Sequence, residues 1–166
     1  MKRLCFLLMA VVLPFMAEAQ VKFGYFSYEE AFRSMPEYAI VQANLNDLRA
    51  KYDAETKRVE EEFNRKYEEC LEGQADFAPT ILQKRQTELQ ELLKKNVAFK
   101  AEAARLLQQA EADAYAPLRE RLSKVLKEIG EGNGYAFILN TDGDACPYID
   151  PEMGEDVLQM VKEALQ

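Results

Sequence analysis

The chain has 166 residues, in which 29 acidic side chains outnumber 21 basic ones, so its formal net charge is −8. Electrostatic binding of nucleic acid depends on Lys and Arg that neutralise phosphates, and a chain this acidic is not suited to it. The sequence contains no histidine. Histidine-based triads, general bases and metal ligands are therefore excluded, and no phosphate-binding Gly-rich loop is present.

The first 19 residues form a predicted secretory signal. Lys2 and Arg3 precede the apolar run Leu4–Met16, and Ala17-Glu18-Ala19 places small residues where a signal peptidase cuts. The run of about 13 residues is shorter than the roughly 20 that span a bilayer as a helix. We expect cleavage after Ala19 and no stable membrane anchor, and the alternative is a retained anchor. Without residues 1–19, 19 basic and 28 acidic residues remain, a net charge of −9.

The mature chain begins with a predicted strand, Val21–Phe26, whose alternation places Val21, Phe23 and Tyr25 on one face. Two capping-box spacings follow. Ser27 lies three residues before Glu30 and predicts a short helix, and Ser34 lies three before Glu37 and predicts the start of a long one. Pro36 fits the first turn of that long helix, where a missing amide costs nothing.

Two long antiparallel helices are predicted between about residues 36 and 130, joined by a short break at 73–79. Gly73 is the expected C-terminal cap of the first helix, and Pro79 fits the first turn of the second. Both carry the narrow apolar stripe of a coiled coil. The first stripe comprises Val41, Leu45, Leu48, Tyr52, Val59, Phe63, Tyr67 and Cys70. The second comprises Leu82, Leu89, Leu93, Val97, Ala104, Leu107, Ala110, Ala114, Leu118, Leu122, Val125 and Ile129.

Pro117 lies inside the second predicted helix and is expected to bend it. We place the end of the helical arm there, so that residues 36–117 form the arm and residues 20–35 and 118–166 form a base. Gly130, Gly132 and Gly134 are expected to end the helix.

The C-terminal part is predicted to complete a small sheet. Residues 135–140 form a second strand, residues 141–144 a hairpin turn around an Asp-Gly pair, and residues 145–149 a third strand. Asp150-Pro151 is expected to cap a last short helix. The alternative for residues 142–144 is a calcium loop, but a third acidic ligand and the downstream Glu are missing.

Three short strands make a poor free-standing sheet with open edges. We therefore predict an α+β fold in which the long antiparallel helical hairpin stands on a small β-barrel base that oligomerisation completes. The number of subunits does not follow from the residues. The residues expected to build this oligomerisation base are Val21, Phe23, Tyr25, Tyr135, Phe137, Leu139 and Tyr148.

Cys70 and Cys146 remain after signal cleavage, and an even count in a secreted protein suggests a disulfide. A rise of about 1.5 Å per residue along the first helix would separate them by roughly 50 Å, far beyond the reach of a disulfide. We therefore predict two free thiols. The acidic run Glu60–Glu62 lies on a polar helix face rather than in a pocket. No enzyme activity and no cofactor are expected.

The ordered set of these features resembles the Skp/OmpH family of periplasmic chaperones for outer-membrane proteins, over the whole mature chain. The resemblance implies a homotrimer with a barrel base built from all three chains, and three arms around a cavity that holds unfolded barrel proteins. The segments that carry it are Val21–Phe26, Met35-Pro36-Glu37-Tyr38, the long charged hairpin, Pro117 before an amphipathic helix, residues 133–139, and Tyr148-Ile149-Asp150-Pro151.

The resemblance implies an ATP-independent holdase in the periplasm of a Gram-negative bacterium, with unfolded outer-membrane proteins as clients and the outer-membrane assembly machinery as a further partner. The alternative is a trimeric coiled-coil spacer of the envelope without clients. Candidate client contacts are Phe77, expected to be exposed at the tip, and Phe99, for which packing inside the arm is the alternative.

A basic patch on the second helix comprises Lys84, Arg85, Lys94 and Lys95. Described members of the family are often basic, and their positive cavity helps capture acidic clients and lipopolysaccharide, so the net charge of −9 is a departure. The patch could retain part of that role. Pairing with the acidic first helix is the alternative we favour, since such exposed ion pairs are common and weak.

Overall fold

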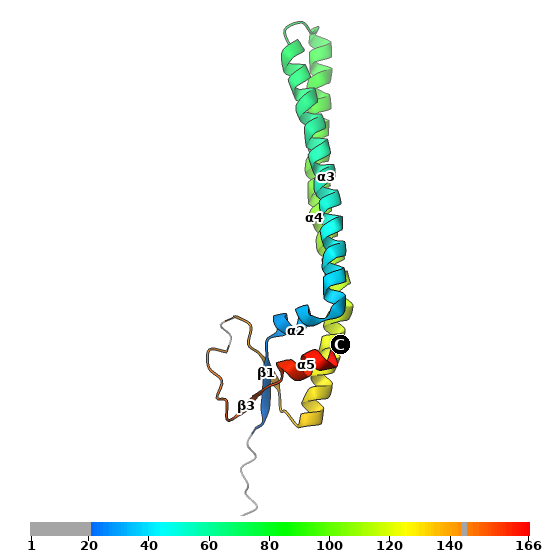
Figure 1. Cartoon of the computed structure of the whole chain (residues 1–166). Coiled ribbons are helices and arrows are strands. Elements are labelled where there is room, and N and C mark those ends of the chain that lie inside the picture. The colour runs from blue at the N-terminus through cyan, green and yellow to red at the C-terminus, as the bar shows by residue number, and fades with distance from the viewer. Residues whose placement is uncertain (1–20, 144–145) are drawn as a thin grey trace, which may run out of the picture. The chain divides into compact units, whose positions relative to one another are not determined.

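The computed structural model describes residues 21–143 and 146–166 of the chain (Figure 1). The predicted signal segment lies outside the described residues. The described chain divides into two compact units, an arm of residues 33–121 and a base of residues 21–32 and 122–166. The structure is mostly helical, with one sheet of three short strands.

The arm consists of α3 (Pro36–Gly73) and the larger part of α4 (Pro79–Asn133), which lie side by side (Figure 1). The break between them falls at the predicted tip. The expected Ser34 cap of α3 is wrong, because Ser34 is the last residue of α2 and Met35 is the N-cap, without a side-chain cap hydrogen bond. Met35 has an extended backbone, as a residue before proline prefers, and its side chain is buried.

The stripe of α3 is largely confirmed, with Leu45 and Cys70 buried. The stripe predicted on α4 is wrong in its middle, where Leu93 and Val97 are 50% and 62% exposed. Asn96 is buried there instead. Its amide donates a 2.9 Å hydrogen bond to the carbonyl of Val59 on α3, which offsets the cost of burying a polar group.

At its opposite end the arm is held by a polar and aromatic cluster. Tyr38 of α3 stacks on Tyr115 of α4 with ring centroids 5.7 Å apart. The Tyr115 hydroxyl donates to Gln42 at 2.8 Å, and Arg121 donates to Glu37 at 2.5 Å. Burial, followed by the neighbouring Tyr38, raises the pKa of Tyr115. The cluster joins the first turns of α3 to α4 by side chains.

α4 continues through Pro117 as helix and ends at Asn133, so the proline does not terminate it. The prediction that Gly130 and Gly132 end the helix is wrong, because both lie inside it. Gly134 ends it with a φ of 69°, which a residue with a side chain rarely adopts. The amide of Tyr135 donates to the carbonyl of Gly130 at 3.0 Å, the hydrogen bond of a glycine-ended helix.

The base contains β1 (Phe23–Phe26), β2 (Ile138–Asn140) and β3 (Gly154–Asp156) in the order β2-β1-β3. Both outer strands are parallel to β1, with Tyr25 opposite Leu139 and Asp156. The predicted hairpin between the second and third strands is therefore wrong. Residues 146–149, expected to form the third strand, are not strand, and Pro147 there has no amide to donate.

Asp142, which was predicted to lie in a hairpin turn, instead helps to cap a helix. Its carboxylate accepts hydrogen bonds from the Ser27 hydroxyl at 2.6 Å and from the Glu29 amide at 2.7 Å, at the start of α2 (Tyr28–Ser34). Ser27 itself accepts the amide of Glu30 at 3.1 Å, as the capping spacing predicted. A residue 115 positions later in the chain thus completes the cap of this helix.

The last helix, α5 (Leu158–Ala164), begins later than predicted. Asp150-Pro151 does not cap it, because the carbonyl of Asp150 accepts the amides of Met153 and Gly154 in a turn before β3. The carboxylate of Asp156 instead accepts the amide of Leu158 at 2.9 Å. Three apolar side chains of this segment are fully buried: Val157, Val161 and Leu165.

The core of the base lies on one side of β1. Gly24 and Phe26 are buried, whereas Phe23 and Tyr25 are only half-buried. A Cβ on Gly24 would lie 3.1 Å from Val157, so glycine lets the segment before α5 approach the strand closely. Cys70 and Cys146 are both free, which confirms the prediction of two unpaired thiols.

Gly154→Ala is expected to destabilise the base. A Cβ there would lie 2.6 Å from the Phe23 ring and 3.1 Å from Ile149, so the ring must move. Overpacking of this kind costs roughly 1–3 kcal/mol. Urea unfolding followed by tyrosine fluorescence, at one fixed protein concentration, measures the change. Gly132→Ala is the matched control, because nothing lies within 4 Å of its added Cβ, and it should be neutral or stabilising. Equal midpoints for the two variants would contradict the packing assigned to Gly154.

Asp142 is expected to make the base sensitive to acid. The hydrogen bond from Ser27, followed by those from backbone amides, lowers the pKa of Asp142 below its ordinary value of 3.8. Its contribution to stability is therefore present above that value and is lost as pH falls through the lower pKa of the folded state. Asp142→Ala should lower the free energy of unfolding by about 1 kcal/mol at pH 6 and by less at pH 3. Thermal unfolding at both pH values tests this, and an equal loss at both would contradict it.

Candidate functional site

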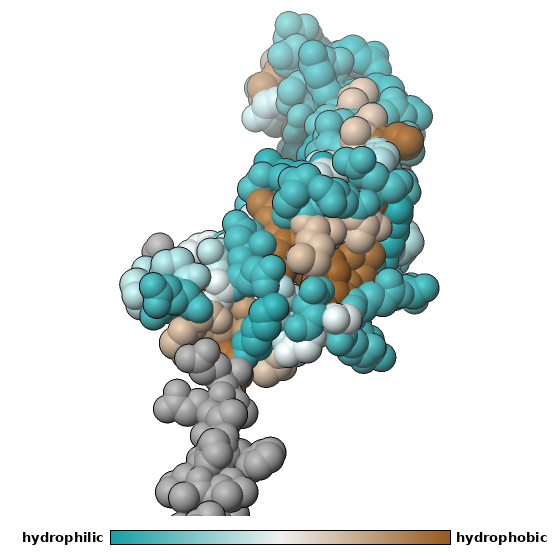
Figure 2. Space-filling model, turned by 60° about the horizontal axis from the view of Figure 1, so that its bottom comes forward, coloured by the Kyte–Doolittle hydropathy of each residue, from teal (hydrophilic) through white to brown (hydrophobic). Residues whose placement is uncertain are grey.

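The first candidate surface is the outer face of the sheet, formed by alternate residues of β1 and β2. The strand register places Tyr25 beside Leu139 on this face. Phe23 stacks on Phe137 with centroids 5.4 Å apart and planes 18° apart. Phe137 is 47% exposed and the other three are half-buried. Four of the residues predicted for the oligomerisation base thus lie together on a face that their own chain leaves partly open. In one view of the whole molecule, apolar surface of unassigned residues lies open between hydrophilic side chains (Figure 2).

The other three predicted base residues are not part of this face. Val21 precedes β1 and is exposed, and Tyr148 is exposed in the loop before β3. Tyr135 is buried within its own chain, where the Lys22 ammonium lies 4.8 Å from the ring centroid. Burial, followed by the neighbouring Glu155 carboxylate, raises the pKa of Tyr135 to about 12. Tyr135 therefore packs the base rather than facing outward.

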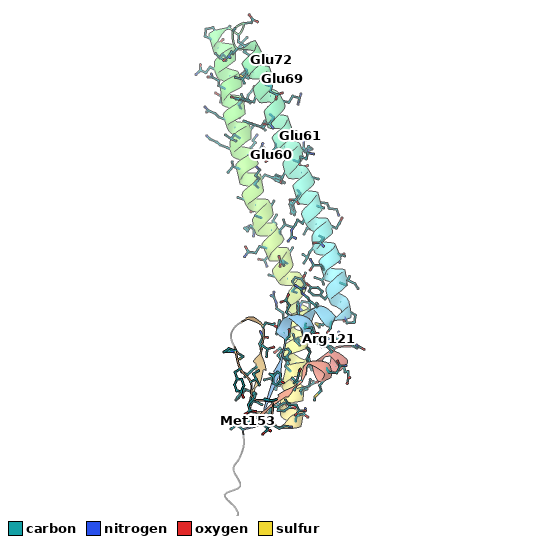
Figure 3. All side chains as sticks on the ribbon, turned by 60° about the vertical axis from the view of Figure 1, so that its left-hand side comes forward. Glu60, Glu61, Glu69, Glu72, Arg121 and Met153 are labelled. Carbon is teal, nitrogen blue, oxygen red and sulfur yellow. The ribbon has the colours of Figure 1, made fainter. Side chains whose placement is uncertain are left out.

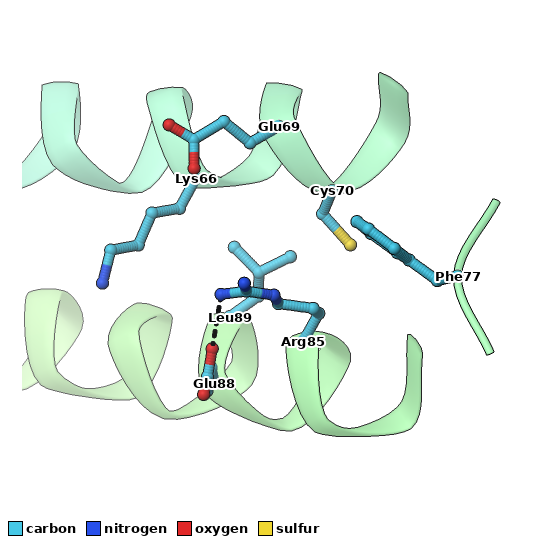
Figure 4. Close-up of a pocket in the computed structure, with 7 residues that line it drawn as sticks. All are labelled: Lys66, Glu69, Cys70, Phe77, Arg85, Glu88 and Leu89. Atoms are coloured by element: carbon cyan, nitrogen blue, oxygen red, sulfur yellow. Dashed lines mark hydrogen bonds and ion pairs between the residues drawn. The ribbon is translucent and has the colours of Figure 1, made fainter. Parts of the chain in front are cut away.

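The tip of the arm contains a small pocket of about 70 Å³, in which Phe77 takes part (Figure 4). The expectation that Phe77 is exposed is wrong, because its ring is half-buried and lies against Gly73, beside Cys70 and Leu89. Gly73 is needed because a Cβ there would lie 2.4 Å from the ring. It is the last residue of α3 rather than its cap, which is Gln74.

Phe99 also packs within the arm. Its ring lies 6.4 Å from that of Tyr52, in a tilted arrangement, and its side chain is half-buried. The alternative interpretation of Phe99, packing between the helices, is the one that this geometry favours. Neither Phe77 nor Phe99 offers a fully exposed ring to another molecule.

The basic patch does not pair with α3. Lys84 and Arg85 form ion pairs with Glu88 of their own helix, at 3.7 and 3.3 Å. Lys94 and Lys95 are exposed and have no ion pair within the described residues. The acidic side chains Glu60, Glu61, Glu69 and Glu72 lie along α3 (Figure 3). The expectation that the basic patch pairs with these acids is therefore wrong for Lys84 and Arg85.

A surface that the sequence analysis missed lies in the middle of the arm. Leu93 and Val97 of α4 and the half-buried Phe63 of α3 line an open groove of about 280 Å³, with the Glu60–Lys100 ion pair at its edge. Phe63 stacks on the exposed Tyr67 with centroids 6.0 Å apart. We call this surface the mid-arm groove. A signal for it was present, because Leu92 and Phe99 continue the spacing of Asn96 and leave Leu93 and Val97 outside the stripe.

The sequence model of one protein family, described as outer membrane protein (OmpH-like), matches residues 22–165 of the chain. The chain belongs to the OmpH-like family. This confirms the family that the sequence motifs indicated. No curated protein matches the sequence of this OmpH-like chain.

The fold of the OmpH-like chain is also found in a solved structure. A crystal structure of a protein described as a candidate outer membrane chaperone (OmpH-like), from Caulobacter crescentus CB15, matches it with a TM-score of 0.71. The alignment covers 90% of this chain and 86% of that one, at 16% sequence identity. At this identity the match shows a shared fold.

Two features are absent from the described part of the OmpH-like chain. Within residues 21–143 and 146–166, no helix is both long and apolar enough to cross a membrane. The same residues contain no cluster of three or more Cys, Asp or Glu positioned to hold a metal ion. The outer face of the sheet and the mid-arm groove both leave apolar side chains open to solvent, as surfaces that contact other proteins often do.

The effect of Gly73→Ala on the stability of the tip is expected to depend on residue 77. The substitution should destabilise the tip when Phe77 is present and stabilise it when Phe77 is replaced. In the native chain the added Cβ collides with the Phe77 ring, so the tip should lose roughly 1 kcal/mol or more. In a Phe77→Ala background the collision is absent, and Ala should stabilise the last turn by up to about 1 kcal/mol. Amide hydrogen exchange at residues 66–73 measures both effects. Additive effects in the double variant would show that the two residues do not interact.

Proposed function

We propose that this protein is an ATP-independent holdase chaperone of the periplasm that binds unfolded outer-membrane proteins between arms and prevents their aggregation. The observation that carries the proposal is the arm, whose exposed surface includes aliphatic side chains that no described part of the chain covers. Family membership supports the same function, because a structural relative of the same family is described as a candidate outer membrane chaperone.

The mechanism we propose is binding without catalysis. An unfolded membrane strand exposes apolar side chains and unpaired backbone amides, and both are prone to association with other chains. Half-exposed Leu93 and Val97 offer contacts that are individually weak. Weak contacts suit a protein that must release its client without ATP, because the client leaves when folding into the membrane becomes more favourable. The predicted signal with cleavage after Ala19 supports a periplasmic location for this binding.

We propose that the working form is a homotrimer in which the sheets join as a barrel. The support is the outer face of the sheet, where Phe23, Tyr25, Phe137 and Leu139 leave an apolar surface partly open. Within the described residues, β2 and β3 form the two edges of the sheet and pair only with β1. Edges of this kind are usually paired or covered, and strands from further copies would cover them.

The chaperone proposal predicts suppression of aggregation. A urea-unfolded outer-membrane barrel protein is diluted with and without the purified mature chain, and light scattering is followed over time. At a several-fold excess of the chain, scattering should fall strongly, and ATP should make no difference. Unchanged scattering would contradict the chaperone and leave the envelope spacer as the remaining interpretation.

The oligomer proposal predicts that charge on the outer face of the sheet separates the subunits. Tyr25→Lys should lower the molar mass measured by light scattering after size exclusion, because a charge would have to be buried without a partner. Ser123→Lys is the control, since Ser123 is exposed on α4 in the same unit. The native chain should have the mass of three copies. A monomeric native chain, or dissociation by both variants alike, would contradict the trimer.

A further inference from the structure

The exposed side of α4 carries a long stripe without any charge. Between residues 83 and 108, every third or fourth residue is uncharged and exposed, and these positions fall in one sector of the helix about 80° wide. Glu111 is the next charged residue in that sector. The uncharged stripe comprises Gln83, Gln86, Gln90, Leu93, Val97, Ala101, Ala104 and Gln108.

This absence of charge is specific to one side of the helix. Over the same length, the other sides of α4 carry Lys84, Glu88, Glu91, Lys95, Glu102 and Arg105, and Lys94 and Lys100 border the stripe. Lys84 and Arg105 there form ion pairs with carboxylates of their own helix, as solvated helix faces commonly do. In a chain with 30% charged residues, a solvent-facing stripe that contains none indicates a surface that contacts something else.

The centre of the uncharged stripe coincides with the mid-arm groove. Leu93 and Val97 line the groove from α4, and Phe63 lines it from α3. Tyr67, which stacks on Phe63, extends the aromatic side of the groove. The stripe is therefore apolar from Leu93 to Ala104, with three Gln side chains before this part and Gln108 after it.

The residues of the stripe fit an extended polypeptide. A Gln side chain can both donate and accept hydrogen bonds, so Gln83, Gln86, Gln90 and Gln108 can pair with the free N–H and C=O groups of a strand. Leu93 and Val97 are separated by a rise of roughly 6 Å, close to the roughly 6.6 Å between alternate side chains of a strand. Two neighbouring apolar side chains on one face of a strand can thus contact both.

The length of the stripe also matches a membrane strand. Residues 83–108 span roughly 38 Å at about 1.5 Å per residue, and an extended chain covers this with about 11 residues. A transmembrane β-strand has about 9–11 residues, with apolar and polar side chains alternating.

A second copy of the chain is a poorer occupant. A lasting coiled-coil contact needs apolar residues at nearly every a and d position, and only two of the eight stripe positions have large aliphatic side chains. Stable interfaces of this kind also bury about 1,200–2,000 Å². The stripe is too weakly apolar for a permanent partner and suits one that leaves.

We infer that the uncharged stripe and the mid-arm groove are where the arm holds its client, and that the bound unit is a single extended strand segment of an unfolded outer-membrane protein. The inference rests on the proposed chaperone function. It adds which face of the arm makes contact and the length of client held. The charged face of α4 stays in solvent.

A new negative charge at single positions of α4 tests the inference. Val97→Glu and Ala104→Glu place a carboxylate on the stripe, and Ala98→Glu places the same group on exposed helix just outside it. Affinity for a fluorescently labelled, urea-unfolded outer-membrane barrel protein is measured by titration after dilution. Val97→Glu should weaken binding about tenfold, equivalent to about 1.4 kcal/mol, and Ala98→Glu by no more than about twofold. Circular dichroism establishes that each variant remains helical.

A second readout reports contact directly. The photo-cross-linking residue p-benzoyl-phenylalanine is placed at position 97, 104 or 98 of the otherwise native chain, and the client is added before irradiation. Cross-links to the client should form from positions 97 and 104 and be several-fold weaker from 98. This readout does not depend on any loss of affinity.

The outcomes separate the inference from the function on which it rests. If the native chain neither binds the client nor suppresses its aggregation, the chaperone function fails. If the native chain binds but all three substitutions act alike and all three positions cross-link equally, the function stands and the stripe is not the contact face. Cross-links between copies of the chain from position 97, with none to the client, would show a second copy as the occupant and overturn the inference.

Discussion

The base of this chain depends on β1, because the described sheet has β2 on one side of it and β3 on the other. Segments near residues 24, 139 and 155 are thus held together although a hairpin of two long helices separates the first two in sequence. Parallel pairing requires a long connection, since a tight turn cannot join parallel strands. β1 also contributes residues to both faces of the sheet. Gly24 admits Val157 on the inner side, and Phe23 and Tyr25 remain half-exposed on the outer side.

The arm is stabilised differently from the base, because two helices packed only on each other bury a narrow row of side chains. Burial there is limited to a few positions, and one of them is the polar Asn96, held by its hydrogen bond to Val59. Placing Asn96 inside turns Leu93 and Val97 outward. The arm gives up some apolar burial between its own helices and presents that apolar surface to solvent. Such a compromise suits a protein that binds others, because exposed aliphatic side chains bring no benefit to an isolated arm.

Family membership and local geometry support the proposed function at different levels. Membership of the OmpH-like family sets the fold and the class of protein. The geometry of the arm then limits which surface can contact a client, because Phe77 and Phe99 pack inward while the uncharged stripe lies open. Its charge pattern explains how an acidic chain could hold a client, since the stripe on α4 carries no charge and the Glu60–Lys100 ion pair at the edge of the mid-arm groove is neutral overall. The ion pairs Lys84–Glu88 and Arg105–Glu102 lie within α4 and contribute little to holding α3.

Helical periodicity, glycine and proline positions, and motif order determined the two long helices, the tip, the first strand, the free cysteines and the family from sequence alone. These features depend on local spacing, which sequence records directly. Other features depend on partners distant in the chain. The carboxylate of Asp142 caps a helix that begins more than a hundred residues earlier, so an Asp-Gly pair predicted as a hairpin turn became part of a cap. β3 follows Pro147 and pairs with the first strand rather than the second. Asn96 is buried and Leu93 is exposed, the reverse of the prediction, because the Val59 carbonyl on the facing helix accepts a hydrogen bond from Asn96. The sequence by itself therefore determined the two long helices and the first strand. Only the tertiary structure decided where β3 forms, which strands pair and which of two possible seams of α4 is buried, because these depend on contacts with residues distant in the chain.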